Sequence, residues 1–211
     1  AIYLKTGRCE VKGMFFKPKM NQAIQQRLKH ETRRIEKSLQ EINKEPDKWI
    51  YHPELSLPIL GRFSLWYDNQ KVYHRERAIV VIKSRYKIGE TVYVKEAWAT
   101  DNKYNHLLPS EIPHTAKLWY MLTDGYYPFT MGIRRSPLFM PEWSARIFPK
   151  ILEVKPQRLQ SMTEQEAKAE GFKADVFTSA KKNFAAYFEV LHPGSWERNE
   201  WVIVYKFEVI R

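Results

Sequence analysis

A lysine, a threonine and three arginines lie together in the sequence Arg27-Leu-Lys-His-Glu-Thr-Arg-Arg34, with Lys29 and Thr32 three residues apart. A threonine hydroxyl is a weak nucleophile at neutral pH and needs a neighbouring base to remove its proton. A lysine can be that base if its pKa is lowered, and both partial burial and the charges of Arg33 and Arg34 act in that direction. The stretch is therefore a reactive site, a phosphate-binding patch or a solvated helix face.

The same residues also have ordinary structural roles. A lysine at a helix end is favoured by the helix dipole, which accounts for Lys29 without any chemistry. A threonine can cap a nearby backbone group, which accounts for Thr32. Arg33 and Arg34 suit phosphate contacts or a salt bridge, and one of the two can simply be solvated.

A short predicted helix precedes this stretch. Met20, Ile24 and Leu28 recur every four residues among polar neighbours, which is typical of one narrow apolar helix face. A helix over residues 20–29 would place Lys29 and Thr32 at its end or just beyond it.

Several other segments have strand patterns. Residues 88–99 (IGETVYVKEAWA) alternate after a glycine turn and predict a strand that ends at Glu96 and Trp98. Residues 200–210 (EWVIVYKFEVI) are nearly apolar in their first half, which predicts a central strand. Shorter or weaker strand patterns cover residues 13–16, 63–67, 78–82 and 145–154.

Two helices are predicted between the strand patterns at residues 145–154 and 200–210. Thr163-Glu-Gln-Glu166 is a capping box, in which a hydroxyl and a carboxylate satisfy backbone donors at a helix start. Gly171 ends this helix after about two turns. A second helix is predicted over residues 179–191, with aromatic residues along one face.

The predicted fold class is α+β, because the strands lack the regular strand–helix alternation of a parallel sheet. A small barrel with helices at its rim satisfies the pattern. The chain has 211 residues and 44% hydrophobic residues, which is enough for one generous domain. Residues 100–143 are rich in aromatics and prolines with little periodicity, and we interpret them as a surface insertion or lid.

The charge balance is basic, with 35 Lys and Arg against 24 Asp and Glu and a formal net charge of +11. This favours encounter with nucleic acid or another polyanion, although basic charge also serves ordinary solubility. Cys9 is the only cysteine, which excludes an intrachain disulfide and fits a reducing cytoplasm. We find no apolar run as long as a membrane span and no signal-peptide pattern, so we expect no membrane association.

Motifs for several classes of active site are absent. The six histidines form no close-spaced pair such as H-x-H or H-E-x-x-H, so we expect no metal and no cofactor. The sequence also lacks a glycine-rich phosphate loop and a G-x-S-x-G nucleophile turn.

An ordered set of short motifs extends through the chain. It comprises Phe15-Phe-x-x-x-Met20, Arg27-x-Lys-x-x-Thr-Arg-Arg34, Gly89-Glu-x-Val-Tyr-Val-x-Glu96-x-Trp98, Met140-Pro-x-Trp143-x-x-Arg146-Ile147, Leu159-x-x-Met162-Thr-Glu-x-x-Ala167-x-x-Glu170-Gly171 and Gly194-Ser-Trp196 followed by Asn199-x-Trp201-Val-x-Val-Tyr. Over residues 13–210 the set resembles the ASCH-domain proteins of the PUA-like superfamily, most closely the long ASCH-like proteins of bacteriophages and prophages. The resemblance implies a single PUA-like domain over residues 1–211, a small mixed β-barrel with rim helices and insertions at about 38–85 and 100–143.

The resemblance also implies an activity. Short members of the family hydrolyse the amide of an acylated cytidine, and their catalytic lysine, threonine and glutamate match Lys29, Thr32 and Glu170. The implied partner is a nucleic acid or a modified nucleoside such as N4-acetylcytidine, in the cytoplasm of a bacterial or phage-infected cell. Because similar proteins also bind or cleave RNA, the alternatives are a non-catalytic reader of RNA or modified DNA and a metal-independent ribonuclease.

Glu170 also has a structural interpretation. A negative charge in the last turn of a helix is slightly unfavourable, and a salt bridge to Arg33 or Arg34 would account for it. The sequence also departs from the family just before the lysine, where short members usually have Gly-Arg and this chain has Arg27-Leu28. That change is expected to alter the turn.

Residues that could line the substrate cleft complete the predicted site. They are Arg27, Arg33, Arg34, Glu96 and Trp98. Ordinary edge pairing of Glu96 and core packing of Trp98 are the alternatives. Further candidates for base stacking or phosphate contact are Trp119, Tyr120, Tyr126, Tyr127 and the basic run 71–87.

Overall fold

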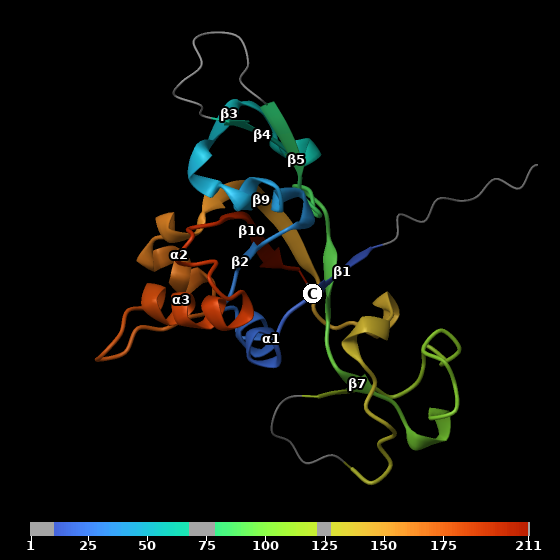
Figure 1. The fold of residues 1–211 in the computed structure, drawn as a ribbon. Helices are drawn as coiled ribbons and strands as arrows, with labels where there is room; N and C mark the ends of the chain where they lie inside the picture. Colours follow the sequence, from blue (N-terminus) through green and yellow to red (C-terminus); the bar gives the residue numbers. More distant parts are fainter. Residues whose placement is uncertain (1–10, 68–78, 122–127, 211) are drawn as a thin grey trace, which may run out of the picture. The chain divides into compact units, whose positions relative to one another are not determined.

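The described chain combines ten short strands with three α-helices and belongs to the α+β class (Figure 1). The computed structural model describes residues 11–67, 79–121 and 128–210. The elements in chain order are β1 (Lys12–Phe15), α1 (Pro18–Gln25), β2 (Glu31–Arg34), β3 (Trp49–Leu57), β4 (Arg62–Tyr67), β5 (Ile79–Lys83), β6 (Val92–Lys95), β7 (Trp98–Ala99), β8 (Trp119–Tyr120), β9 (Pro149–Arg158), α2 (Glu164–Ala169), α3 (Ala180–Leu191) and β10 (Trp201–Val209).

The chain divides into two units. The described residues of 11–22, 91–149 and 210 form the first unit, and those of 23–90 and 150–209 form the second. The prediction of one domain over residues 1–211 stays a prediction.

A three-stranded sheet in the order β2-β10-β9 forms the centre of the second unit. Strand β10 is central, as its apolar sequence predicts, and it runs antiparallel to β2 with Tyr205 opposite Thr32. Val202 and Val204 of β10 are buried in a cluster with residues of α2 and α3. The two helices therefore cover the face of the sheet to which these valines point.

The predicted helices beside this sheet are confirmed. Thr163 and Glu166 form the complete capping box at the start of α2. Gly171 follows the helix with φ of 92°, a left-handed conformation that glycine adopts without strain. Ser179 caps α3 by accepting a hydrogen bond from the Lys182 amide.

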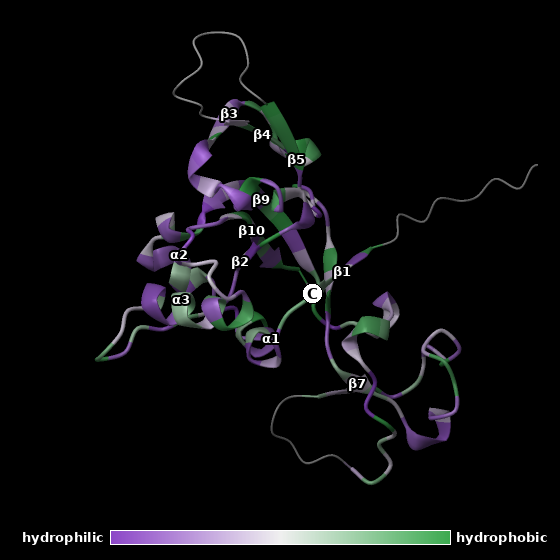
Figure 2. Ribbon diagram, in the orientation of Figure 1, coloured by the Kyte–Doolittle hydropathy of each residue, from purple (hydrophilic) through white to green (hydrophobic). Residues whose placement is uncertain are grey.

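A second three-stranded sheet, β3-β4-β5, lies in the region expected to be an insertion. The predicted strands 63–67 and 78–82 correspond to β4 and β5, and Figure 2 shows the apolar character of β5. Strand β3 was not predicted, because Pro53 and its polar neighbours hide the alternation. An edge strand tolerates proline, and the pairing register shifts between His52 and Leu57.

In the first unit, β1 pairs in parallel with β6, and β7 pairs antiparallel with β8. The predicted strand over residues 88–99 is therefore two strands, interrupted at Glu96. Residues 100–143 contain β8, two single turns of 3₁₀ helix and the start of a third in their described part, which fits their weak periodicity. Trp98 is fully buried beside Met140 and Ala145.

The described strands form four separate sheets of two or three strands, and none of these sheets closes into a barrel. The expected barrel is therefore not found in the described chain. None of the described helices has the length and apolar character that crossing a membrane requires.

The capping box yields a first prediction. Thr163→Ala removes the hydroxyl that accepts a hydrogen bond from the Glu166 amide, with 3.1 Å between the Glu166 nitrogen and Thr163 Oγ1. The loss of this cap should lower the free energy of unfolding by about 1 kcal/mol. Urea denaturation measures the change. The control is Gln165→Ala on the exposed side of the same helix, which should stay within about 0.5 kcal/mol of the original chain. Equal losses in both variants would contradict the capping role.

Candidate functional site

Lys29 and Glu170 meet in the second unit, although 141 residues separate them in the sequence. The Lys29 ammonium contacts a carboxylate oxygen of Glu170 and also donates to the Glu170 backbone carbonyl at 3.0 Å. The two residues are only 2% and 3% exposed. A buried, directly bonded lysine and glutamate therefore form the centre of the candidate site.

The backbone on both sides holds this pair in place. Lys29 and Glu170 form an isolated antiparallel bridge, and the His30 amide donates to the Ala169 carbonyl at 2.8 Å. A side chain at Gly171 would bring its Cβ within 3.3 Å of the Lys29 Cβ, so a glycine suits the close approach. The contact between Lys29 and Glu170 thus follows from main-chain pairing as well as from charge.

The turn that precedes Lys29 has an unusual conformation. Helix α1 ends at Gln25, earlier than predicted, and Leu28 is exposed. The amides of Leu28 and Lys29 both donate to the Ala23 carbonyl, at 2.9 and 3.1 Å. Arg27 closes the turn with φ of 57°, in the region that favours glycine. The arginine therefore adopts the conformation for which glycine is the usual choice, and its side chain is exposed.

Arg33 is buried and lies among three carboxylates. Its guanidinium is 3.2 Å from a Glu170 oxygen, 3.3 Å from a Glu31 oxygen and 3.2 Å from a Glu166 oxygen. It also donates to the Gln157 side chain at 3.0 Å. The salt bridge to Arg33 gives Glu170 the structural role that was the alternative to catalysis. Arg33 itself faces protein carboxylates.

Burial has a clear electrostatic effect on Lys29. Removal from water lowers the pKa of Lys29 below its usual range, because the charged ammonium is less well solvated. The Glu170 carboxylate opposes this effect, while the charges of Arg34 and Arg33 add to it. Burial likewise raises the pKa of Glu31. Lys29 is thus in surroundings that favour proton release.

Thr32 and Arg34 occupy the alternate positions of β2. Successive strand residues point to opposite faces, so Thr32 lies on the other face from Arg33. Thr32 is buried opposite Tyr205, and within the described chain its hydroxyl makes no hydrogen bond to Lys29 or Glu170. The structure therefore joins two of the three predicted catalytic residues by direct bonds and places the third, Thr32, on β2 opposite Tyr205.

Glu96 and Trp98 belong to the first unit. Arg146 holds Glu96 with two hydrogen bonds of 2.9 and 2.8 Å and stacks over the Tyr120 ring at 4.1 Å. Trp98 packs edge-on against Trp143. Both residues thus have the edge-pairing and core roles that were the alternatives to cleft lining.

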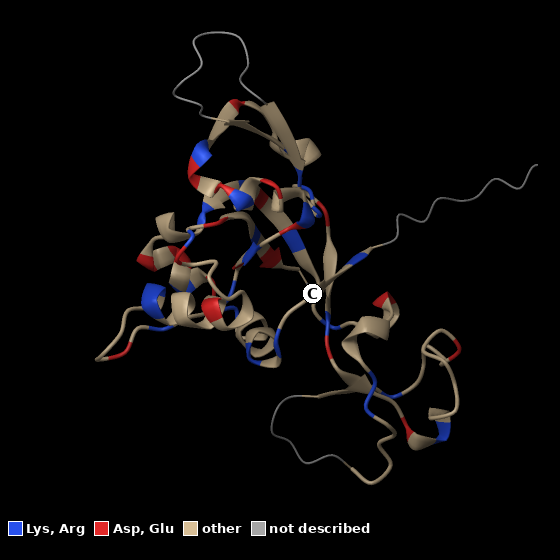
Figure 3. Cartoon of the chain, viewed as in Figure 1, with Lys and Arg blue, Asp and Glu red and all other residues tan. Residues whose placement is uncertain are grey.

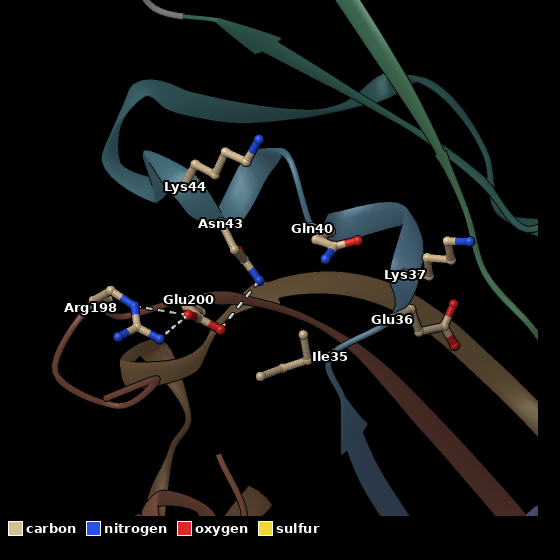
Figure 4. Close-up of a pocket in the computed structure, with 8 residues that line it drawn as sticks. All are labelled: Ile35, Glu36, Lys37, Gln40, Asn43, Lys44, Arg198 and Glu200. Atoms are coloured by element: carbon tan, nitrogen blue, oxygen red, sulfur yellow. Dashed lines mark hydrogen bonds and ion pairs between the residues drawn. The ribbon is translucent and has the colours of Figure 1, made fainter. Parts of the chain in front are cut away.

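A pocket of about 480 Å³ lies just beyond the carboxyl-terminal end of β2, and its lining begins at Ile35 (Figure 4). Lys37 and Lys44 are exposed at its rim, and Asn43 and Glu200 are buried in its wall. Arg198 donates to the Glu200 carboxylate at 2.6 and 2.9 Å. This pocket had no counterpart in the sequence prediction, because its lining comes from chain segments about 160 residues apart that no shared motif connects.

Apart from Glu170, the partners of Arg33 in the described chain were not predicted from the sequence. Glu31 had a detectable signal, since it shares a strand face with Arg33 two residues later. Glu166 was recognised only as a capping residue, and Gln157 had no signal. The stacking candidates Tyr126 and Tyr127 and residues 71–78 of the basic run lie outside the described residues.

Removing the buried guanidinium should strongly destabilise the second unit. Arg33→Ala leaves buried carboxylates without their cation, and we expect the free energy of unfolding to fall by roughly 3–5 kcal/mol. Urea denaturation again measures it. The control Arg62→Ala changes an exposed arginine of β4 and should cost less than about 0.5 kcal/mol. A small loss from Arg33→Ala would contradict the role of this cluster.

Comparisons of the chain with models of protein families, with curated proteins and with solved structures find no match.

Proposed function

We propose that this protein binds a nucleoside or a nucleic acid through a PUA-like fold and hydrolyses the amide of an N-acylated pyrimidine such as N4-acetylcytidine. The observation that carries the proposal is the direct contact between Lys29 and Glu170 across 141 residues of sequence. Buried lysine–glutamate pairs with a lowered lysine pKa are suited to proton transfer, and such perturbed groups are enriched at functional sites.

The chemistry divides between these two residues. Lys29 in its neutral form accepts a proton from the attacking hydroxyl, which is Thr32 or a water molecule. The oxygen adds to the acetyl carbon, and the tetrahedral intermediate collapses by breaking the bond to the N4 nitrogen. The departing amine takes this proton back from the Lys29 ammonium, either directly or through the Glu170 carboxylate. If Thr32 attacks, water then hydrolyses the acetyl ester, and the products in either case are cytidine and acetate.

The arginines differ in what they offer this reaction. Arg33 is engaged with Glu31, Glu166 and Glu170, so we assign it to holding the carboxylates. Arg27 is exposed and could contact a substrate phosphate. Phosphate binding in this proposal therefore depends on Arg27.

The second candidate function is a non-catalytic reader of RNA or modified DNA. Lys37 and Lys44 at the rim of the pocket favour it, because exposed cations suit an anionic ligand, while Glu36 and the Arg198–Glu200 pair line the rest. The occupation of both Glu170 carboxylate oxygens by Lys29 and Arg33 points the same way. For metal-independent ribonuclease activity, the third alternative, the test is RNA cleavage that Glu170→Gln removes.

The decisive test is removal of the Lys29 amine. We expect the protein to release acetate from N4-acetylcytidine and Lys29→Ala to lower the rate by about 10²- to 10⁴-fold, the usual contribution of a positioned base. Mass spectrometry of the nucleoside measures the loss of the acetyl group. Lys150→Met is the control, since this lysine of β9 is exposed and should keep full activity.

Two results would count against this proposal, the first against catalysis itself and the second against Lys29 as the base. One is a wild-type protein that turns over no acylated nucleoside yet binds nucleic acid in a salt-dependent way, which supports the reader. The other is unchanged activity in Lys29→Ala. Thr32→Ala separates the two nucleophiles, because the rate collapses if threonine attacks and persists if water does.

The activity should also depend on pH in a defined direction. Only neutral Lys29 accepts a proton, so kcat/KM should rise with pH until it passes the lowered pKa of Lys29, which lies below the usual value of 10.5. Below that pKa, the rate should fall about tenfold for each pH unit. Initial rates between about pH 6 and 10 measure the profile. A profile that falls with rising pH across this range would exclude Lys29 as the base.

A further inference from the structure

The loop that joins α2 to α3 presents two apolar side chains to solvent. Val176 and Phe177 are each 90% exposed, and Figure 1 shows this orange loop extending away from both helices. Burying a phenylalanine or a valine normally gains about 1.5–3 kcal/mol relative to exposure. Two adjacent apolar residues that forgo this gain are a candidate contact surface.

Hydrogen bonds fix the conformation of the loop. The Asp175 carboxylate accepts from the amides of Phe177 and Thr178, both at 2.8 Å. The Asp175 amide donates back to the Thr178 carbonyl at 2.9 Å. The Thr178 hydroxyl bonds to the Asn183 side chain at 2.7 Å. Val176 and Phe177 are therefore held outward by a bonded turn, which lowers the entropy lost when they bind.

The charges beside the loop are mainly positive. Lys168, Lys173 and Lys182 are exposed, and Figure 3 shows basic residues on both sides of the loop. The carboxylate of Asp175 faces backbone amides within the turn. An apolar tip with lysines at its base is complementary to a ligand that offers flat apolar faces between negative charges.

The loop begins close to the candidate site. Glu170 ends the segment that bonds to Lys29, and the loop starts two residues later at Phe172. Phe172 anchors the loop on α3 through Phe184 and Tyr187, with ring centroids 5.5 and 5.3 Å apart. The base of the loop therefore lies two residues from the glutamate that bonds to Lys29.

We propose that Val176 and Phe177 form a wedge that stacks against the bases of single-stranded nucleic acid while the nearby lysines contact its phosphates. Bases have apolar faces that aromatic side chains bind regardless of sequence, and enzymes that act on one base must separate it from its neighbours. The inference rests on the proposed function and specifies its substrate as a polynucleotide.

The test is binding of a single-stranded RNA oligonucleotide that contains 2-aminopurine, a base whose fluorescence responds to stacking. We expect Phe177→Ala to weaken binding about tenfold and to abolish the fluorescence change, while Phe177→Trp retains both. The double variant Lys173→Gln with Lys182→Gln should reduce the slope of log affinity against log salt by about 1.4. Circular dichroism should be unchanged, because the substituted side chains are exposed.

The matched control is Phe129→Ala, which removes a phenylalanine that is 99% exposed in the first unit. Binding should be the same as for the original protein. Equal losses in Phe129→Ala and Phe177→Ala would overturn the wedge. Unchanged RNA binding in Phe177→Ala would overturn it too, as would Phe177-dependent binding only to phosphatidylserine vesicles, which would assign the loop to a membrane surface.

Separate readouts distinguish this inference from the proposed function. If the protein deacetylates free N4-acetylcytidine and Phe177→Ala binds RNA normally, the wedge fails and the activity stands. If no acylated pyrimidine is hydrolysed and RNA binding depends on Phe177, the activity fails and the wedge stands.

Discussion

The second unit depends on one buried cation. The Arg33 guanidinium joins β2 to the Gln157 side chain of β9 and to Glu166 and Glu170 of the α2 segment. A buried charge is tolerated only when hydrogen-bonded opposite charges surround it, so Arg33 and its carboxylates must fold together. Because strand residues alternate between faces, fixing Arg33 toward α2 also determines that Thr32 and Arg34 face the other way.

This arrangement links stability to chemistry. The same carboxylate of Glu170 that neutralises Arg33 also bonds to Lys29, and a proton transferred between Lys29 and Glu170 would change the charge balance around Arg33. Burial is the main cause that lowers the pKa of Lys29, and the charges of Arg34 and Arg33 add to it. Arg33, whose first role is to hold the fold, thus also contributes to the lowered pKa of Lys29.

Sequence reasoning succeeded where a pattern is local. The capping box at Thr163, the left-handed Gly171 and the central apolar strand β10 each depend on neighbouring residues, and each was predicted correctly. Strand β3 was missed because Pro53 breaks its alternation. Partners such as Gln157 depend on which strands lie side by side, which periodicity does not encode. Lys29 and Glu170 were paired through the motif resemblance, since no local rule relates residues so far apart.

That separation has a consequence for synthesis. Lys29 and Glu170 are 141 residues apart in the sequence. Strand β2 pairs with β10, the last strand of the second unit in sequence order. Contacts between residues so far apart in the sequence cannot form until both segments have left the ribosome. The charged residues of β2 therefore stay without these partners during most of synthesis. The buried charges of the candidate site are then among the last features to form during translation.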